Sequence, residues 1–128
     1  MDDIFMVMSV NLQFLFAIRN TDIEKIQYLI KLGANTNYCD PQLGSAIITA
    51  VTRQNLDVIA LLISHGANVN KANHFNVTPI EVALKVANPE VINLLVAHGA
   101  ILKERSSYFY LRQIKRYIPP FYESKQSY

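Results

Sequence analysis

One spacing recurs through the middle of the chain and constrains its fold more than any other feature. Gly33, Gly66 and Gly99 lie 33 residues apart, and an alanine follows each of them. Apolar residues before each glycine share this spacing: Ile26, Ile59 and Ile92; Leu29, Leu62 and Leu95; Ile30, Ile63 and Val96. Because so many positions agree in one register, the sequence predicts repeat units that stack on one another.

Each unit ends in a predicted helix. The apolar positions fall at i, i+3 and i+4, which makes one apolar stripe on a helix. Glycine commonly ends a helix in the left-handed conformation. Before each stripe stands a residue whose side chain caps helix N-termini, namely Asp22, Asn55 and Asn88. Pro89 suits the first helical position, where its missing N–H costs nothing. We therefore expect helices near 22–32, 55–65 and 88–98.

A second helix precedes each of these. The run Thr78-Pro79-Ile80-Glu81 has the pattern of a capping box and predicts a helix that continues to Leu84. Its counterparts one and two periods earlier are 45–51 and 12–18, and an alanine recurs in all three. Turn-forming residues fill 37–44 and 70–77, between the units.

The apolar stretch from Ile4 to Ile18 is interpreted as a buried helix. A secretory signal would begin with positive charge, whereas this chain begins with two aspartates. A membrane span needs about 17–25 apolar residues, and Ser9, Asn11 and Gln13 interrupt this stretch. We therefore expect a cytoplasmic protein, either in its own cytosol or in that of a host. The single cysteine, Cys39, excludes an internal disulfide and agrees with a reducing compartment.

The Gly-Ala-Asn-x-Asn segments at 33–37 and 66–70, the run at 78–84 and the 33-residue period resemble the ankyrin-repeat family. The resemblance covers about 10–105. It implies an all-α solenoid of stacked antiparallel helix pairs joined by β-turn fingers. The family's turn glycine is replaced by Leu43 in one finger and by Asn76 in the next. Asn accepts the left-handed conformation more readily than Leu, so we expect Gly44 to shift the first turn.

This comparison divides the chain into one domain, 1–118, and a tail, 119–128. Three units at about 10–36, 37–69 and 70–102 are followed by a C-terminal cap, because the last unit of a solenoid needs a water-compatible face. The cap is expected at 103–118, where an apolar stripe alternates with basic residues before Pro119 and Pro120 stop the helix. Residues 1–10 do not match the repeat and are expected to close the N-terminal end.

No enzymatic motif is recognisable, so we expect no enzyme, no cofactor and no metal. The chain lacks a phosphate-binding loop, a nucleophile elbow and a His-Glu-x-x-His motif. His65 and His98 stand directly before the period glycines, where a donor side chain suits the last helical carbonyls. Cys39 and His74 lie on neighbouring fingers, but two ligands do not make a structural zinc site.

The resemblance implies a protein–protein interaction module, such as an inhibitor, adaptor or microbial effector, which we expect to be monomeric. The family's variable contact positions carry over to finger and helix residues of this chain: Pro41, Gln42, Gly44, Thr52, Arg53, His74, Phe75, Val77, Lys85, Val86, Tyr108 and Tyr110. Phe75, at a finger tip, is either an exposed anchor for the partner or a residue packed against the next finger. Both interpretations remain open from the sequence.

Cations recur where the first helices end. Arg19, Thr52 and Lys85 are equivalent by period, and Arg53 follows Thr52 directly. Positive charge at a helix C-terminus is stabilised by the helix dipole, which alone explains these residues. The same positions line the concave surface in ankyrin proteins, so contact with a partner is the second interpretation.

Charge is unevenly distributed along the chain. Residues 1–102 hold six basic and eight acidic residues, whereas 103–128 hold six basic and two acidic, together with five of the seven tyrosines. The alternative function is therefore binding of an acidic partner, nucleic acid or membrane surface through this basic aromatic segment. A solvated cap explains the same pattern, and a net charge of +2 disfavours nucleic acid and membrane as the main partner.

Overall fold

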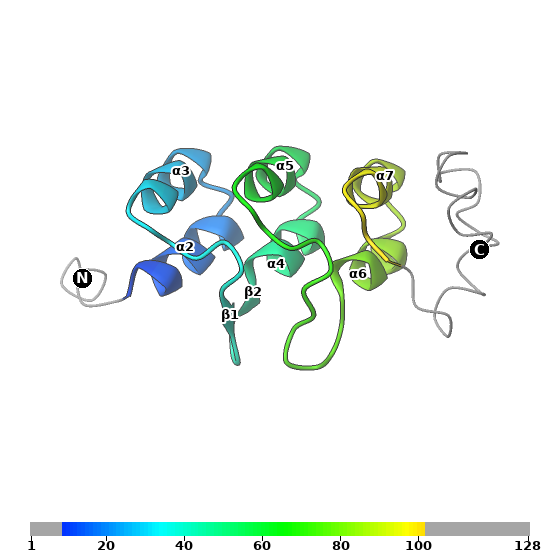
Figure 1. The fold of residues 1–128 in the computed structure, drawn as a ribbon, viewed down its shortest axis with the longest axis horizontal. Helices are drawn as coiled ribbons and strands as arrows, with labels where there is room; N and C mark the ends of the chain where they lie inside the picture. Colours follow the sequence, from blue (N-terminus) through cyan, green and yellow to red (C-terminus); the bar gives the residue numbers. More distant parts are fainter. Residues whose placement is uncertain (1–8, 102–128) are drawn as a thin grey trace.

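A computed structural model describes residues 9–101, which form three antiparallel helix pairs side by side (Figure 1). The helices are α2 (Val10–Arg19), α3 (Ile23–Lys31), α4 (Ala46–Thr52), α5 (Leu56–Ser64), α6 (Pro79–Val86) and α7 (Pro89–Ala97). One row, α2, α4 and α6, lies on the side of the fingers, and α3, α5 and α7 form the other row (Figure 1). We call the first row the inner row and the second the outer row. The predicted all-α solenoid is confirmed.

The outer helices begin and end as the sequence predicts. At each N-cap a side-chain Oδ1 accepts a hydrogen bond from a backbone N–H three residues later. The donor–acceptor distances are 3.2 Å at Asp22, 3.1 Å at Asn55 and 3.3 Å at Asn88. The helices end before glycines in the left-handed region, with φ values of 97° at Gly33, 89° at Gly66 and 92° at Gly99.

The inner helices agree with the prediction less closely. Ser45 caps α4, because its Oγ accepts from the backbone N–H of Ile48 at 3.1 Å. Thr78 holds the N-cap position of α6, but its hydroxyl makes no cap hydrogen bond and is buried without a partner. The capping box predicted there is therefore wrong for Thr78, although Pro79 does occupy the first helical position. Its fixed φ and absent N–H favour the helix start without help from a hydroxyl.

The first helix begins before the repeat pattern does. Ser9 caps α2, since its Oγ accepts from the backbone N–H of Leu12 at 3.2 Å, so α2 starts at Val10 rather than near Leu12. The expectation that all of 1–10 lies outside the repeat helices is therefore wrong for Val10. The earlier part of the predicted helix from Ile4, like the predicted cap and tail, lies outside the described residues.

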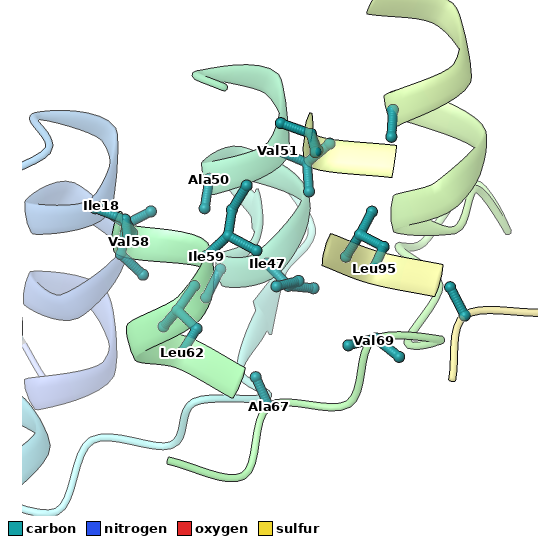
Figure 2. Packing of buried hydrophobic residues seen from close by; sticks show 14 of the residues in the cluster. Ile18, Ile47, Ala50, Val51, Val58, Ile59, Leu62, Ala67, Val69 and Leu95 are labelled. Atoms are coloured by element: carbon teal, nitrogen blue, oxygen red, sulfur yellow. The ribbon is translucent and has the colours of Figure 1, made fainter. Parts of the chain in front are cut away.

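The core runs continuously between the two rows. Helix α4 contacts α2 and α6, and α5 contacts α7. Figure 2 shows Ile47 of α4 and Ile59 and Leu62 of α5 together in this interior; Ile47 is 2% exposed and the other two are fully buried. The small residues Ala17, Ala50 and Ala83, equivalent by period, are buried at the close approach of the inner helices. Stacking, rather than any single pair, therefore buries the apolar faces.

Each finger is held by one acceptor side chain. In the first, β1 (Cys39–Asp40) pairs antiparallel with β2 (Gly44–Ser45), and Asp40 Oδ1 accepts from two backbone N–H groups of the turn at 2.8 and 2.9 Å. In the second, Asn73 takes the same role one period later, at 2.9 and 3.1 Å. Gly44 has φ 86° and Asn76 has φ 61°, so the predicted shift of the first turn to Gly44 is confirmed.

Asn37 joins the segment that follows α3 to the segment that follows α5, through both ends of its side-chain amide. Its Oδ1 accepts from the backbone N–H of Asn68 at 2.7 Å, and its Nδ2 donates to the carbonyl of Gly66 at 3.2 Å. The acceptor and one donor of the amide are thus satisfied by backbone groups that follow the next outer helix. The link ties the start of one finger to the end of the following outer helix.

The same link recurs in the other units. Asn70 accepts from the backbone N–H of Ile101 at 2.8 Å and donates to the carbonyl of Gly99 at 3.0 Å. At the N-terminal end the acceptor comes from a helix instead, because Asn11 of α2 accepts from the backbone N–H of Asn35 at 2.8 Å. We call Asn11, Asn37 and Asn70 the asparagine ladder. Its members Asn37 and Asn70 fix the spacing of successive helix pairs alongside the apolar core, and Asn11 holds the first pair together.

The turns between paired helices contain left-handed residues that are not glycine. Thr21, Gln54 and Ala87 are equivalent by period and have φ values of 52°, 56° and 55°. The left-handed conformation costs a residue with a Cβ about 1–2 kcal/mol. These three turns therefore carry strain that the core offsets.

Opposite substitutions should reveal this strain. We expect Ala87→Gly, at an exposed position, to raise the free energy of unfolding by about 0.5–1 kcal/mol. The backbone strain that glycine relieves at this positive φ outweighs the conformational entropy that glycine adds to the unfolded chain. Gly66→Ala should lower it by about 1 kcal/mol, although a Cβ there meets no atom within 4 Å. Urea unfolding followed by circular dichroism measures both. Shifts of the same sign would contradict this account.

Candidate functional site

Some of the predicted contact residues line two hollows on the finger side of the solenoid. The first, which we call the finger hollow, lies between the two finger tips and has a volume of about 110 Å³. Pro41, Gln42, Leu43 and Gly44 line it from the first finger, and His74 and Phe75 line it from the second, beside Asp40 and Asn73. Residues more than 30 positions apart thus meet across one gap.

The second hollow lies where α2 and α4 end, beside the base of the first finger. This helix-end pocket has a volume of about 400 Å³. Arg19 and Arg53 line it, and Leu43 and Ile48 supply apolar surface. Gly44, Ser45, Thr49 and Thr52 complete the lining. Leu43 and Gly44 line both hollows, so the two form one continuous surface.

Most predicted contact residues are accessible, but the structure gathers only some of them. Gln42, His74 and Phe75 meet at the finger hollow, and Thr52 and Arg53 meet in the helix-end pocket. Three others line neither hollow: Lys85, which is exposed, and Val77 and Val86, which are half-buried. Tyr108 and Tyr110 lie outside the described residues.

Phe75 is the most exposed large apolar side chain among residues 9–101. It is 80% exposed, whereas the outer-row residues Tyr28 and Leu32 are 60% and 52% exposed. The interpretation that Phe75 packs against the neighbouring finger is therefore wrong. An aromatic ring held at the tip of an ordered turn is instead available to a partner.

The cations take the helix-end positions that the sequence predicts. Arg19 and Lys85 lie in the last turns of α2 and α6, and Arg53 is the C-cap of α4, so the dipole explains their placement. Arg19 and Arg53 also share one pocket, which the dipole does not require. From the sequence, partner contact is only the second interpretation of Arg19, and Leu43 and Ile48 are not among the contact residues. The signal was available, because Arg19 is equivalent by period to Thr52 and Lys85.

The two period histidines have structural roles. His65 Nδ1 lies 2.9 Å from the carbonyl oxygen of Leu61, and His98 Nδ1 lies 2.9 Å from that of Leu94. Since a carbonyl only accepts, each Nδ1 donates to one of the last helical carbonyls, as predicted. Within residues 9–101, no three His, Cys, Asp or Glu side chains are placed to hold a metal ion, and no helix there is long and apolar enough to cross a membrane.

Comparison with known families identifies the repeat. A model of ankyrin repeats in three copies matches residues 14–106, which is most of the chain. The chain belongs to the ankyrin-repeat family. Ankyrin repeats are generally protein–protein interaction modules. A comparison with curated protein sequences found no match. In this ankyrin solenoid, the finger hollow and the helix-end pocket lie on the face formed by the fingers and the inner helices.

Proposed function

We propose that this ankyrin solenoid binds a partner protein through its finger tips and the ends of its inner helices. The observation that carries the proposal is the convergence of contact positions from successive units on one continuous surface. Phe75 and Gln42 lie at the finger hollow, and Thr52 and Arg53 lie in the adjoining helix-end pocket. An exposed aromatic beside arginine is a typical composition for the energetic centre of an interface.

Rigidity supports the same proposal. The asparagine ladder and the Asp40 and Asn73 turns hold the fingers through side-chain hydrogen bonds to the backbone. Association costs less free energy when the surface is already ordered, since fewer rotamers and loops must be fixed. A stacked solenoid therefore presents variable side chains on a surface that changes little when a partner binds.

The test is capture of a partner followed by titration of the purified partner against variants of the full chain. We expect Phe75→Ala to weaken binding about tenfold, because an aromatic anchor that the partner buries contributes more than about 1 kcal/mol to the binding free energy. Adding Lys85→Glu should weaken it further. Tyr28→Ala, which removes an exposed aromatic from outer helix α3, is the matched control and should leave the affinity unchanged.

Two results would contradict the proposal. One is unchanged affinity in the double variant while it stays folded. The other is loss of binding only when the six basic residues of 103–128 are replaced by glutamine, together with a steep salt dependence. The second result would favour the basic aromatic segment over the solenoid surface.

A further inference from the structure

We propose that the helix-end pocket binds a carboxylate side chain of an acidic, extended segment of the partner protein. This inference rests on the proposed function and names the chemistry that the surface selects. It starts from Arg19 and Arg53, which come from different units and line the same pocket of about 400 Å³. A planar guanidinium binds a carboxylate through two parallel N–H donors. The guanidinium groups of two arginines therefore suit one carboxylate between them.

The arginines are the pocket's free donors. The hydroxyls of Thr49 and Thr52 donate to the carbonyls of Ser45 and Ile48, both at 2.8 Å, and their hydrogens are thereby used. Within residues 9–101, no ion pair or hydrogen bond engages the Arg19 or Arg53 guanidinium. The donors needed to hold an anion are thus present without the breaking of an existing link.

The electrostatic balance favours an anion in spite of the helix ends. The C-termini of α2 and α4 each carry about half a negative charge, because their last carbonyls point outward. Two guanidinium groups contribute two full positive charges, which leaves the pocket with about one net positive charge. One carboxylate matches that charge. Leu43 and Ile48 line the same pocket and suit the methylene stem of a glutamate.

Lys85 extends the pattern by one unit. It lies in the last turn of α6, is equivalent by period to Arg19 and Thr52, and is exposed. Packed helices lie about 8–10 Å apart. A segment in the polyproline II conformation presents the same side every three residues, or about 9 Å. An acidic residue in the helix-end pocket would therefore place a second acidic residue, three positions away, near Lys85.

The described surface favours an acidic peptide over nucleic acid. Residues 9–101 hold six basic and six acidic residues, so this part of the solenoid has no net charge to attract a polyanion. The chain's own segment 103–128 does not fit either, since it carries six basic and two acidic residues.

The probe is a fluorescent peptide, Ala-Pro-Glu-Ala-Pro-Glu-Ala-Pro, with a glutamine counterpart in which both acids are neutral. Fluorescence polarisation with the full chain measures its affinity up to millimolar concentration. We expect the glutamine peptide to bind at least tenfold more weakly. Arg19→Gln and Arg53→Gln should each weaken binding of the acidic peptide about tenfold, and Lys85→Gln about threefold. Lys71→Gln removes an exposed cation outside both hollows and should change nothing.

Several outcomes would overturn the inference. Equal binding of the two peptides, or no binding of the acidic peptide, means that the pocket does not select carboxylates. If peptide binding is lost only when the basic residues of 103–128 are neutralised, the peptide binds to that segment and not to the pocket. If an eight-nucleotide oligothymidylate binds more tightly than the acidic peptide, and Arg53→Gln abolishes its binding, the pocket binds phosphate rather than carboxylate. Unchanged urea midpoints in the variants exclude unfolding as the cause.

The captured partner separates this inference from the proposed function. If its binding depends on Phe75 but not on Arg19 or Arg53, the solenoid surface is the binding site and the acidic-segment inference is wrong. If its binding depends on none of the three, the proposed function itself is wrong. If it depends on all three, both are supported.

Discussion

Leu62→Ala should lower the free energy of unfolding by about 2–5 kcal/mol. Leu62 is fully buried in the middle unit, on α5, which contacts both α4 and α7. Its truncation removes apolar contacts and leaves a cavity that a stack fixed on both sides collapses poorly. Urea unfolding of the full chain, followed by far-ultraviolet circular dichroism, measures the loss.

The matched control is Leu32→Ala, the same substitution at a position that is 52% exposed. It should cost less than about 0.5 kcal/mol, as most surface substitutions do. A loss below about 1 kcal/mol for Leu62→Ala would mean that this leucine is not at the centre of the stack. The register of the repeat would then be wrong.

Asn37→Ala should lower the free energy of unfolding by about 2 kcal/mol. It removes two links between the segments that follow α3 and α5, namely the acceptor for the Asn68 N–H and the donor to the Gly66 carbonyl. Each hydrogen bond contributes about 0.5–1.5 kcal/mol net. The same urea experiment measures the loss.

Two further variants sharpen this result. Asn20→Ala removes an exposed asparagine whose side chain makes no hydrogen bond within residues 9–101, and should be nearly neutral. Asn37→Asp keeps one acceptor but places a second oxygen opposite the Gly66 carbonyl, so it should cost at least as much as Asn37→Ala at neutral pH. If Asn37→Ala were as mild as Asn20→Ala, the asparagine ladder would not contribute to the stacking.

The sequence predicts those parts of the fold that depend on neighbouring residues along the chain. The caps at Asp22, Asn55 and Asn88 and the stops at Gly33, Gly66 and Gly99 are of this kind, since one side chain or one φ value decides each. The turn shift to Gly44 follows for the same reason.

The features that the sequence did not predict lie outside the repeat pattern or depend on packing between helices. The helix start at Val10 is set by Ser9, which has no equivalent in the other units, so periodicity did not reveal it. The strained φ values of Thr21, Gln54 and Ala87 are tolerated because each turn joins two helices that pack against each other. The spacing did reveal Asn37 and Asn70 as equivalent positions. Only the geometry shows that they join the segments that follow successive outer helices.

The same limit applies to the candidate site. Period analysis predicts that Thr52, Arg53 and Lys85 lie at the ends of inner helices, and each does. It gives no measure of which side chains share a pocket, because that depends on the distance between units. The structure, and not the repeat period, therefore shows that Arg19 and Arg53 line one pocket. The exposure of Phe75 in the structure likewise shows that this side chain faces solvent.

The most direct test of partner binding by the fingers and the inner helices is hydrogen–deuterium exchange of the full chain with and without the captured partner. We expect protection to rise in both fingers, at 40–45 and 73–77, and at the ends of α2, α4 and α6. The outer helices α3, α5 and α7 should exchange as in the free chain. Protection confined to the outer helices, or to 103–128 alone, would contradict the account.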